Sequence, residues 1–343
     1  MLTNKKILQI TVRSDQGGGP KHLFDLIKAM DTKKYSVSVV SPVDEPFYGL
    51  YKNLCETHIE IPHRKFSIIS FLKILLFCRE NGIQIVHSHG LGAGIYSRLL
   101  GLFGLKVIHT FHGIHYPKSL SDKVKINLGV LLKYFTDTFI CVSHSEMDNA
   151  VNLNQCFSNQ TIVIANGIDE AKYICSKRED GPITQISSIS RLDEHKNISE
   201  TLRFLAKLKN EKSFQFFYNI AGDGDQKEEL KSLVKELELQ EETVFLGNVD
   251  DVAGLLSKTD LFVSSSKGEG LPYSILEAMA ANCKILCSNV TGHKDLLSGH
   301  NLYDLGNYES FKDSILKVER VSFDKKYSIE SMVNSVQDIY SSF

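Results

Sequence analysis

Two glutamates separated by seven residues give the first indication of chemistry in this chain. Glu269 and Glu277 lie in SSSKGEGLPYSILEAMAANC, residues 264–283, where the second glutamate falls among apolar residues. Pro272 suits the first position of a helix, so we expect a helix to begin near residues 271–273 with free backbone N–H groups. Such a helix start favours phosphate, while the two carboxylates can bind two hydroxyl-bearing parts of one extended ligand.

A second pair of charged residues follows an expected strand in SISRLDEHKN. Arg191 and Lys196 lie five positions apart, across a loop that enters a helix. Two cations in this position can converge on one phosphate group, with Arg supplying a planar fork and Lys a point charge. A solvated charged loop is the alternative for this stretch taken alone.

Three glycines, Gly17 to Gly19, separate the first expected strand from a helix in DQGGGPKHL. Glycine allows close approach of a ligand to the backbone, and the helix start favours an anion. The stretch lacks the GK[ST] ending of a Walker A loop, and His22 stands where a dinucleotide fingerprint needs its last glycine. We expect Gly18 and Gly19 to approach a ligand, with a tight turn as the alternative.

The histidines of VHSHG and HTFHGIH raise the question of a metal site: His87, His89, His109, His112 and His115. We expect none there, because these stretches contain no carboxylate and strand alternation offers no obvious fourth ligand. His112 precedes a glycine at a strand end, so we interpret it as a polar group that lines a ligand-binding cleft.

Two further loops have a structural explanation. AGDGDQKEEL contains Asp223 and Asp225 in a DxD pattern that binds metal in some enzymes, but the charged helix start behind it favours a turn with a helix N-cap. Gly222 in the same loop follows an expected strand, so it remains a candidate for ligand contact. GLGAGIYSR, residues 90–98, fails the dinucleotide fingerprint because Ile95 replaces the third glycine, and helix packing explains it.

Apolar runs alternate with helix-like segments along the chain, from KILQIT and YSVSVVSP to LFVSSS and KILCSN. This alternation predicts βα units and parallel sheets. A polar segment that closes with Gly-Pro divides the runs into two series. We therefore predict a Rossmann-like domain over 1–165, a linker over 166–182, a second Rossmann-like domain over 183–320 and a C-terminal helix over 321–343.

The candidate residues share one place in this scheme. In doubly wound sheets, ligands bind beyond the carboxyl ends of the strands. The candidates follow expected strands: Gly17 to Gly19, His112, Ser143, Arg191, Gly222 and Glu269. Two such domains facing each other would place these residues in a cleft between them.

Composition narrows the function classes. The chain has 343 residues, 42% of them hydrophobic, and a formal net charge of −2, which argues against a dedicated nucleic-acid binder. Seven scattered cysteines lack metal or disulfide spacing, and no long apolar run or cleavage site occurs, so we expect a mature intracellular protein with reduced thiols. Residues 1–175 carry 19 Lys and Arg against 14 Asp and Glu, which suggests an anionic partner such as a phosphate or an acidic membrane.

The pattern E-x7-E in EGLPYSILEA, taken with Arg191 and Lys196, resembles the signature of retaining glycosyltransferases of family GT4. Further landmarks occur in the family's order over nearly the whole chain: the glycine loop, TFHG, VSHSE, NGID, SRLDEHKN, AGDGD and FLGNVDDV. The resemblance implies the α/β fold called GT-B, with two facing Rossmann-like doubly wound parallel-sheet domains and an interdomain cleft. In that fold the last helix crosses back to the N-terminal domain.

The resemblance also implies roles for individual residues. In the C-terminal domain, Glu269 would contact the donor sugar and Glu277 the nucleotide ribose. The diphosphate would be bound by Arg191 and Lys196, with help from the backbone N–H groups of Gly270 and Leu271. From the N-terminal domain, His112, Gly18 and Gly19 would lie beside the reacting carbon and the leaving phosphate. The reaction would retain the anomeric configuration without an essential metal or cofactor.

Small bacterial members of the family commonly build surface polysaccharides on lipid-linked acceptors. We therefore expect transfer of a hexose or N-acetylhexosamine, with UDP as the commoner carrier, in O-antigen or capsule assembly. This chain reads EGLP where many members read EGFG, so the sugar is not carried over. Residues 63–80 and 118–135 mix Lys and Arg with Phe, Leu and Ile, which fits peripheral contact of a cytoplasmic enzyme with the inner membrane or ordinary amphipathic helices.

Two other function classes remain open at this point. A non-hydrolysing sugar-nucleotide epimerase shares the two-domain architecture, but it needs catalytic carboxylates at the sugar that the order of motifs does not suggest. A catalytically silent, transferase-like binding protein is the non-enzyme alternative, and the intact Glu269, Glu277, Arg191 and Lys196 argue against it.

Overall fold

The computed structural model describes residues 4–114, 120–173, 181–211 and 215–343. The chain divides into two compact units, one formed by Met1–Gly167 with Lys326–Phe343 and the other by Ile168–Lys325. Part of the expected linker, residues 174–180, lies outside the described residues, as do His115, Cys175 and residues 118–119 of the second amphipathic segment. No helix among the described residues is both long enough and apolar enough to cross a membrane.

The N-terminal unit is built on a seven-stranded parallel sheet with the order β3-β2-β1-β4-β5-β6-β7. The central strands β1, β2 and β4 are almost continuously buried, as strands covered on both faces of a parallel sheet must be, although polar residues occur in each of them. The bounds are β1 Lys5–Thr11, β2 Tyr35–Ser41, β3 Thr57–Glu60, β4 Ile85–His89, β5 Lys106–Thr110, β6 Thr138–Cys141 and β7 Thr161–Val163.

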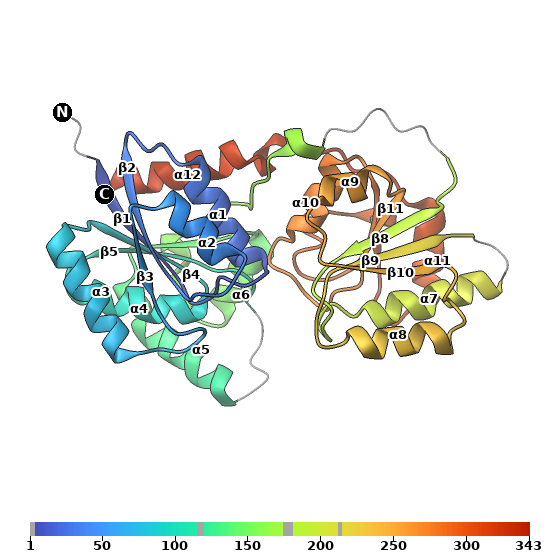
Figure 1. Ribbon diagram of the computed structural model, residues 1–343, viewed down its shortest axis with the longest axis horizontal. Helices are drawn as coiled ribbons and strands as arrows, with labels where there is room; N and C mark the ends of the chain where they lie inside the picture. Colours follow the sequence, from blue (N-terminus) through green and yellow to red (C-terminus); the bar gives the residue numbers. More distant parts are fainter. Residues whose placement is uncertain (1–3, 115–119, 174–180, 212–214) are drawn as a thin grey trace. The chain divides into compact units, whose positions relative to one another are not determined.

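Helices cover both faces of this sheet (Figure 1). One face carries α1 (Gly18–Ala29), α2 (Phe47–Leu54) and α12 (Ile329–Ser342), whose side chains form one core with β1 and β2. The other face carries α3 (Ile68–Asn81) and α4 (Leu91–Gly101), with α5 (Leu120–Leu132) beside α4. Helix α6 comprises His144–Asn152. The last helix of the chain, capped by Ser328, therefore belongs to the core of the N-terminal unit.

The C-terminal unit repeats the same plan with a six-stranded parallel sheet of order β10-β9-β8-β11-β12-β13. Its core lies mainly between the sheet and α7, α8 and α11. The strands are β8 Gln185–Ile189, β9 Phe217–Ala221, β10 Thr243–Gly247, β11 Leu261–Ser264, β12 Lys284–Ser288 and β13 Leu302–Tyr303. The helices are α7 Ile198–Asn210, α8 Lys227–Glu236, α9 Val252–Ser257, α10 Tyr273–Ala280 and α11 Tyr308–Lys317.

In each unit the first strand by sequence has the second strand on one side and the fourth on the other. This order reverses direction beside β1 and beside β8, which is the topological switch point of doubly wound sheets. Short 3-10 helices connect some elements: η1 Lys133–Phe135, η2 Ser158–Gln160, η3 Glu170–Tyr173, η4 Gly299–Asn301 and η5 Lys325–Tyr327. The expected fold class, two Rossmann-like parallel-sheet domains, is confirmed.

The start of α10 lies within the predicted range, although Pro272 takes a different position there, and the cap of α8 differs from the prediction. Helix α10 begins at Tyr273, and Pro272 occupies the N-cap with φ −72° and ψ 126° rather than the first helical position. Helix α8 begins at Lys227 with Gln226 as its N-cap, so an Asp cap from the DGD turn is wrong. Asp223 instead accepts from the backbone N–H of Gly224 at 2.8 Å and pairs with Lys227, because a tight turn leaves its carboxylate nearer to these groups.

Candidate active site

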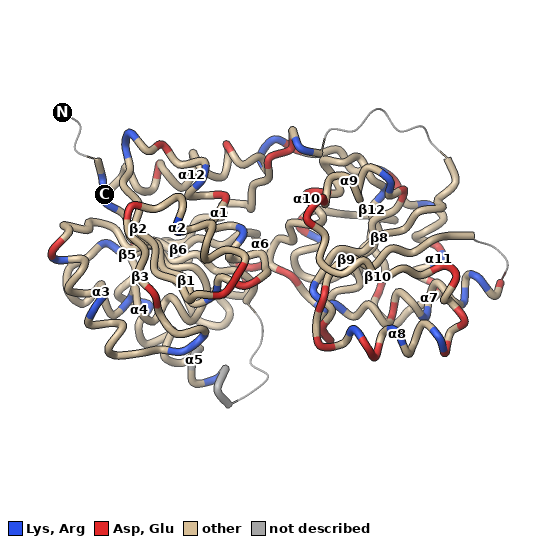
Figure 2. Tube along the Cα trace, in the orientation of Figure 1, with Lys and Arg blue, Asp and Glu red and all other residues tan. Residues whose placement is uncertain are grey.

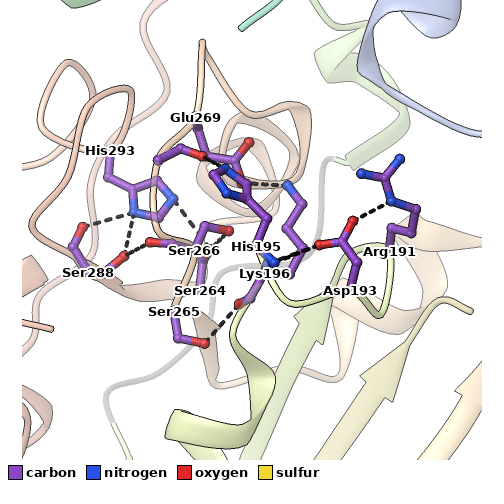
Figure 3. Close-up of polar contacts among 11 residues, drawn as sticks. Arg191, Asp193, His195, Lys196, Ser264, Ser265, Ser266, Glu269, Ser288 and His293 are labelled. Carbon is purple, nitrogen blue, oxygen red and sulfur yellow. Dashed lines mark hydrogen bonds and ion pairs between the residues drawn. The ribbon is translucent and has the colours of Figure 1, made fainter. Parts of the chain in front are cut away.

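A charged network forms in the C-terminal unit where β8 and β11 end (Figure 3). Lys196 forms an ion pair with Glu269, and both side chains are mostly buried, with 21% and 15% of their surface exposed. Burial alone raises the pKa of Glu269, but the charge of Lys196 opposes it and, together with His293, lowers that pKa to about 2. Glu269 is therefore an ionised acceptor that can bind hydroxyl groups at neutral pH.

Arg191 is oriented by Asp193, a residue that sequence analysis did not single out. The Arg191 Nε donates to Asp193 Oδ2 at 2.5 Å, and Figure 3 shows its two terminal nitrogens pointing away from this carboxylate. Asp193 Oδ1 accepts from the backbone N–H groups of His195 at 3.0 Å and Lys196 at 3.1 Å. One carboxylate thus fixes the loop that carries both predicted phosphate-binding cations.

Glycine at position 222 is required by the same loop. With φ 129°, Gly222 brings the turn after β9 so close that an added Cβ would lie 1.8 Å from the carbonyl oxygen of Ser190. Ser190 directly precedes Arg191, and its N–H donates to Ala221 at 3.0 Å. The structure therefore gives Gly222 a role in positioning Arg191, while direct contact with a donor stays a prediction.

The loop that carries Glu269 is held from two sides. His195 Nε2 donates to the carbonyl oxygen of Gly268 at 2.6 Å, and the N–H of Glu269 donates to Thr291 at 3.0 Å. Gly292 has φ 84°, and a Cβ there would lie 2.6 Å from the carbonyl oxygen of Glu269. A side chain at position 292 would displace Glu269, so this glycine is part of the site's support.

His293 lies behind Glu269 and is fully buried. Its Nδ1 donates to the carbonyl oxygen of Ser288 at 2.9 Å, and its Nε2 lies 3.3 Å from Ser264 Oγ (Figure 3). Burial lowers the pKa of His293, although the charge of Glu269 partly opposes this effect. The residue follows β12 just as the predicted site residues follow their strands, and that rule applied to VTGH could have found it.

Glu277 lies apart from this network, within α10. It is buried, with 6% of its surface exposed, and its Oε1 accepts from the hydroxyl of Tyr173 in η3 at 3.0 Å. Gly270 and Leu271 connect Glu269 to the N-cap of α10, where Pro272 forms no side-chain cap. The N-terminus of a helix favours a negatively charged group such as phosphate.

The N-terminal unit gathers a different cluster. His112 follows β5, and an added Cβ at Gly19 in the first turn of α1 would meet its ring at 3.5 Å. His22 from α1 and His89 from the end of β4 complete a group whose nitrogens lie within 4.8 Å of one another. The structure thus brings Gly19 and His112 together, while Gly18 is exposed beside them at the helix start.

Hydrogen bonds define the state of these rings. His89 Nδ1 lies 3.2 Å from His112 Nε2, and His89 Nε2 lies 2.9 Å from the side-chain oxygen of Gln9. Gln9 in turn donates to the hydroxyl of Tyr340 in α12 at 2.8 Å. Burial holds the pKa of His112 and of His89 well below the ordinary value, so both rings are neutral at physiological pH.

The histidines of the two adjacent stretches do not all lie together in the structure. His87 binds Tyr340 and Thr110 inside the sheet layer, and His109 lies 2.9 Å from Ser88 in the core. His22, which had counted only as a missing glycine, is the third member of the cluster instead. The three partners come from separate elements, so no local spacing could have predicted them.

The loop behind His112 is fixed by Glu146 in VSHSE. This buried carboxylate accepts from the N–H of Gly113 at 2.5 Å and from that of Val142 at 2.8 Å. Ser143 caps α6 by accepting from the N–H of Glu146 at 3.1 Å. A helix cap and a buried carboxylate therefore set the backbone next to His112.

Comparisons with known proteins match the two units separately. Residues 16–172 match the model of the family described as "Glycosyltransferase Family 4", and residues 170–329 match that of "Glycosyl transferases group 1". The two matches together span both units.

Named relatives are similar over most of the chain. The "O-antigen biosynthesis glycosyltransferase WbnH" of Escherichia coli is 26% identical, with 98% of this chain and 99% of that protein covered. The "UDP-Gal:alpha-D-GlcNAc-diphosphoundecaprenol alpha-1,3-galactosyltransferase" of Escherichia coli is also 26% identical, covering 77% of this chain and 72% of that protein. Among solved structures, Anabaena HepE in complex with UDP and glucose shares the fold, with a TM-score of 0.85, 18% identity and coverage of 99% and 100%.

Proposed function

The chain belongs to the family 4 glycosyltransferases, which have the GT-B fold, and on this premise we propose that it transfers a hexose or N-acetylhexosamine from a UDP-sugar to a lipid-linked saccharide. The network of Arg191, Lys196 and ionised Glu269 carries the proposal. It presents two cations for a diphosphate and one carboxylate for sugar hydroxyls on a single preformed loop system.

The chemistry follows from where charge develops. Cleavage of the bond between the anomeric carbon and the diphosphate oxygen leaves negative charge on the nucleotide, and preorganised cations lower the barrier. Arg191, Lys196 and the N-terminus of α10 supply this positive charge in our proposal, so no essential metal is needed. The acceptor hydroxyl attacks the same face, and its proton passes to the departing phosphate oxygen, which retains the anomeric configuration.

Glu277 has the second role that an extended donor needs. Its carboxylate accepts a hydrogen bond from Tyr173, which fixes its orientation. Glu277 follows the start of α10 in the sequence, whereas Glu269 precedes it, and we propose that Glu277 binds the ribose hydroxyls. Names of relatives support the substrate classes: one is a galactosyltransferase that uses UDP-Gal and a diphosphoundecaprenol acceptor, and HepE was solved with UDP and glucose. We assign the chain to O-antigen, capsule or similar surface-polysaccharide assembly on this support.

The N-terminal unit suits an acceptor that resides at a membrane. Helix α3 turns an apolar stripe toward solvent, with Ile68 and Ile69 each 67% exposed and Leu72 and Leu76 more than half exposed. Lys73 and Arg79 lie on the same helix, where Figure 2 marks basic residues. Apolar and basic side chains together bind an anionic bilayer surface, so we propose peripheral contact of a cytoplasmic enzyme through α3.

Vesicle co-sedimentation tests the membrane contact. The double change Ile69→Glu and Leu72→Glu should reduce the fraction bound to vesicles that contain anionic lipid about tenfold or more, because it buries two charges in place of apolar groups. Leu316→Glu in α11 is the matched control, since that leucine is 64% exposed in the C-terminal unit. Equal binding of the two variants would remove α3 from the proposal.

The transfer function is tested by slow donor hydrolysis in EDTA. Purified protein is incubated with UDP-glucose, UDP-galactose, their N-acetylated forms and GDP-mannose, and NMR follows the released sugar. Release from one UDP-sugar with the α-anomer appearing first is the expected result. A β-anomer would contradict retention, and a requirement for Mg²⁺ would contradict metal independence. An epimerised donor would reveal an epimerase. Donor binding without turnover on any lipid-linked acceptor would indicate a catalytically silent binding protein.

A further inference from the structure

The three histidines of the N-terminal unit pose a question that the proposed transfer does not answer. His22 is 1% exposed, and its Nε2 has no hydrogen-bond partner among the described residues. Buried polar atoms are nearly always paired, so an orphaned ring nitrogen calls for an explanation. The atom belongs to the group of His22, His89 and His112, the one cluster of potential metal ligands found in the described residues.

Neighbouring amides fix which ring nitrogen of each buried histidine carries the proton. His22 Nδ1 donates to the side-chain oxygen of Asn166 at 3.0 Å, which leaves a lone pair on its Nε2. His89 Nε2 donates to the side-chain oxygen of Gln9 at 2.9 Å, which leaves a lone pair on its Nδ1. This lone pair accepts from the Nε2–H of His112 at 3.2 Å, and a bound ion would replace that proton between the two rings. Metal-binding histidines typically donate their other N–H to an oxygen acceptor in this way.

Distances fit a small four-coordinate ion. A tetrahedral ion bound to imidazole at about 2.0–2.1 Å requires ligand nitrogens about 3.3 Å apart. His89 Nδ1 and His112 Nε2 are 3.2 Å apart, and all three ligand atoms lie within 4.8 Å of one another. The partly exposed side chain of His112 offers the entry path.

We propose that His22, His89 and His112 form a binding site for a borderline transition-metal ion such as Zn²⁺, with a fourth position open to water. Three neutral imidazoles select such ions over Mg²⁺ and Ca²⁺, which require oxygen ligands. The ion is not a cofactor of transfer. It holds the ring of His112, for which the family resemblance implies a role in the reaction, so metal occupancy and transfer exclude each other; this last step rests on the proposed function.

Cobalt titration of the chelator-treated full-length protein tests the site directly. Co²⁺ should bind in a 1:1 ratio and give the intense visible bands of a four-coordinate complex, which Zn²⁺ then abolishes by displacement. His22→Asn should weaken Co²⁺ binding about tenfold or more and remove the four-coordinate bands. The control His63→Asn, at a histidine that pairs with Asp44 at the surface, should leave the titration unchanged.

X-ray absorption of the Co²⁺-loaded wild-type protein keeps the test independent of how the variants fold. Three imidazole ligands are expected, and an octahedral, oxygen-rich shell would overturn the site. Co²⁺ binding unaffected by His22→Asn in a folded protein would overturn it as well. The experiment uses neither donor nor acceptor, so its failure is separate from failure of the proposed transfer. Turnover in saturating Zn²⁺ equal to that in EDTA would overturn the exclusion of transfer by metal.

Discussion

The two units share one strand order, but one has charged side chains at the ends of its strands and the other has neutral ones. In the C-terminal unit, the loops after β8 and β11 hold ion pairs, Arg191 with Asp193 and Lys196 with Glu269. In the N-terminal unit, the ends of β4 and β5 carry neutral histidines that bond to amides and to each other. The same topology therefore offers a charged site in one unit and an uncharged one in the other.

Overall charge does not explain this difference. The second half of the chain is the acidic one, with 20 Lys and Arg against 27 Asp and Glu in residues 176–343. Its site nevertheless presents two cations on one loop, because Asp193 binds both the Arg191 side chain and the backbone N–H of Lys196. Net charge thus says little about a phosphate site, whereas the local arrangement of a few side chains decides it.

Among the changes considered for the two sites, removal of the Arg191 side chain should cause the largest loss of activity. If the charged site stabilises the departing diphosphate, Arg191→Ala should lower kcat by about 10²–10³ with the fold intact. Steady-state kinetics measures kcat, and circular dichroism shows whether the variant is folded. Arg203→Ala, an exposed arginine of α7, is the matched control and should stay near the wild-type rate. Near-normal turnover of Arg191→Ala would show that the charged site is not catalytic.

Loss of Lys196 should destabilise the C-terminal unit in a pH-dependent way. Lys196→Met leaves the buried carboxylate of Glu269 unpaired, which costs about 3 kcal/mol of unfolding free energy at neutral pH. The wild-type pair contributes fully above the ordinary Glu pKa of 4.5, and this contribution is lost as pH falls toward the folded pKa of about 2. The deficit of the variant should therefore shrink below pH 4.5.

Urea unfolding at a series of pH values, followed by circular dichroism, measures this deficit. The surface pair of Lys231 and Glu228 in α8 supplies the control, because Lys231→Met removes a charge at a solvated site. A deficit for Lys196→Met that stays constant from pH 7 to acid would mean that Glu269 does not depend on Lys196 for its ionisation.

Tyr340→Phe tests the neutral site by comparison. The change removes the hydroxyl that contacts Gln9 at 2.8 Å and His87 at 2.6 Å, so a buried amide and a ring lose a partner. We expect a loss of about 1–3 kcal/mol in unfolding free energy, nearly independent of acid pH because no carboxylate is involved. Tyr134→Phe, at a tyrosine that is 71% exposed, should change stability by less than about 0.5 kcal/mol. Equal stability of the two variants would contradict the role of the buried chain of hydrogen bonds.

The smallest predicted effect concerns Glu277, which is charged but separate from the diphosphate site. Glu277→Gln keeps the shape and replaces a charge-assisted hydrogen bond to ribose by a neutral one, so KM for the donor should rise about tenfold with kcat nearly unchanged. Glu236→Gln at the exposed end of α8 is the control. A fall in kcat without a change in KM would move Glu277 from donor binding to the chemical step.

Local patterns predicted the elements and the charged half of the site. Short apolar runs identified the strands except the two-residue β13. The place of Arg191, Lys196 and Glu269 behind strands predicted that they would share one sheet edge. The supports of those residues escaped prediction. Asp193 and Gly292 look like ordinary loop residues until Asp193 is seen to bind the Arg191 side chain and Gly292 to lie against the backbone of Glu269.

The βα alternation, the two series of strands and the residue types available for phosphate and hydroxyl binding could be predicted, because these depend on periodicity and on neighbours along the chain. Which histidines lie together depends instead on how the elements pack. His22, His89 and His112 come from a helix and two strand ends, and Tyr340 reaches Gln9 from the last helix of the chain. Contacts over such separations depend on strand order and helix packing, which no local pattern encodes.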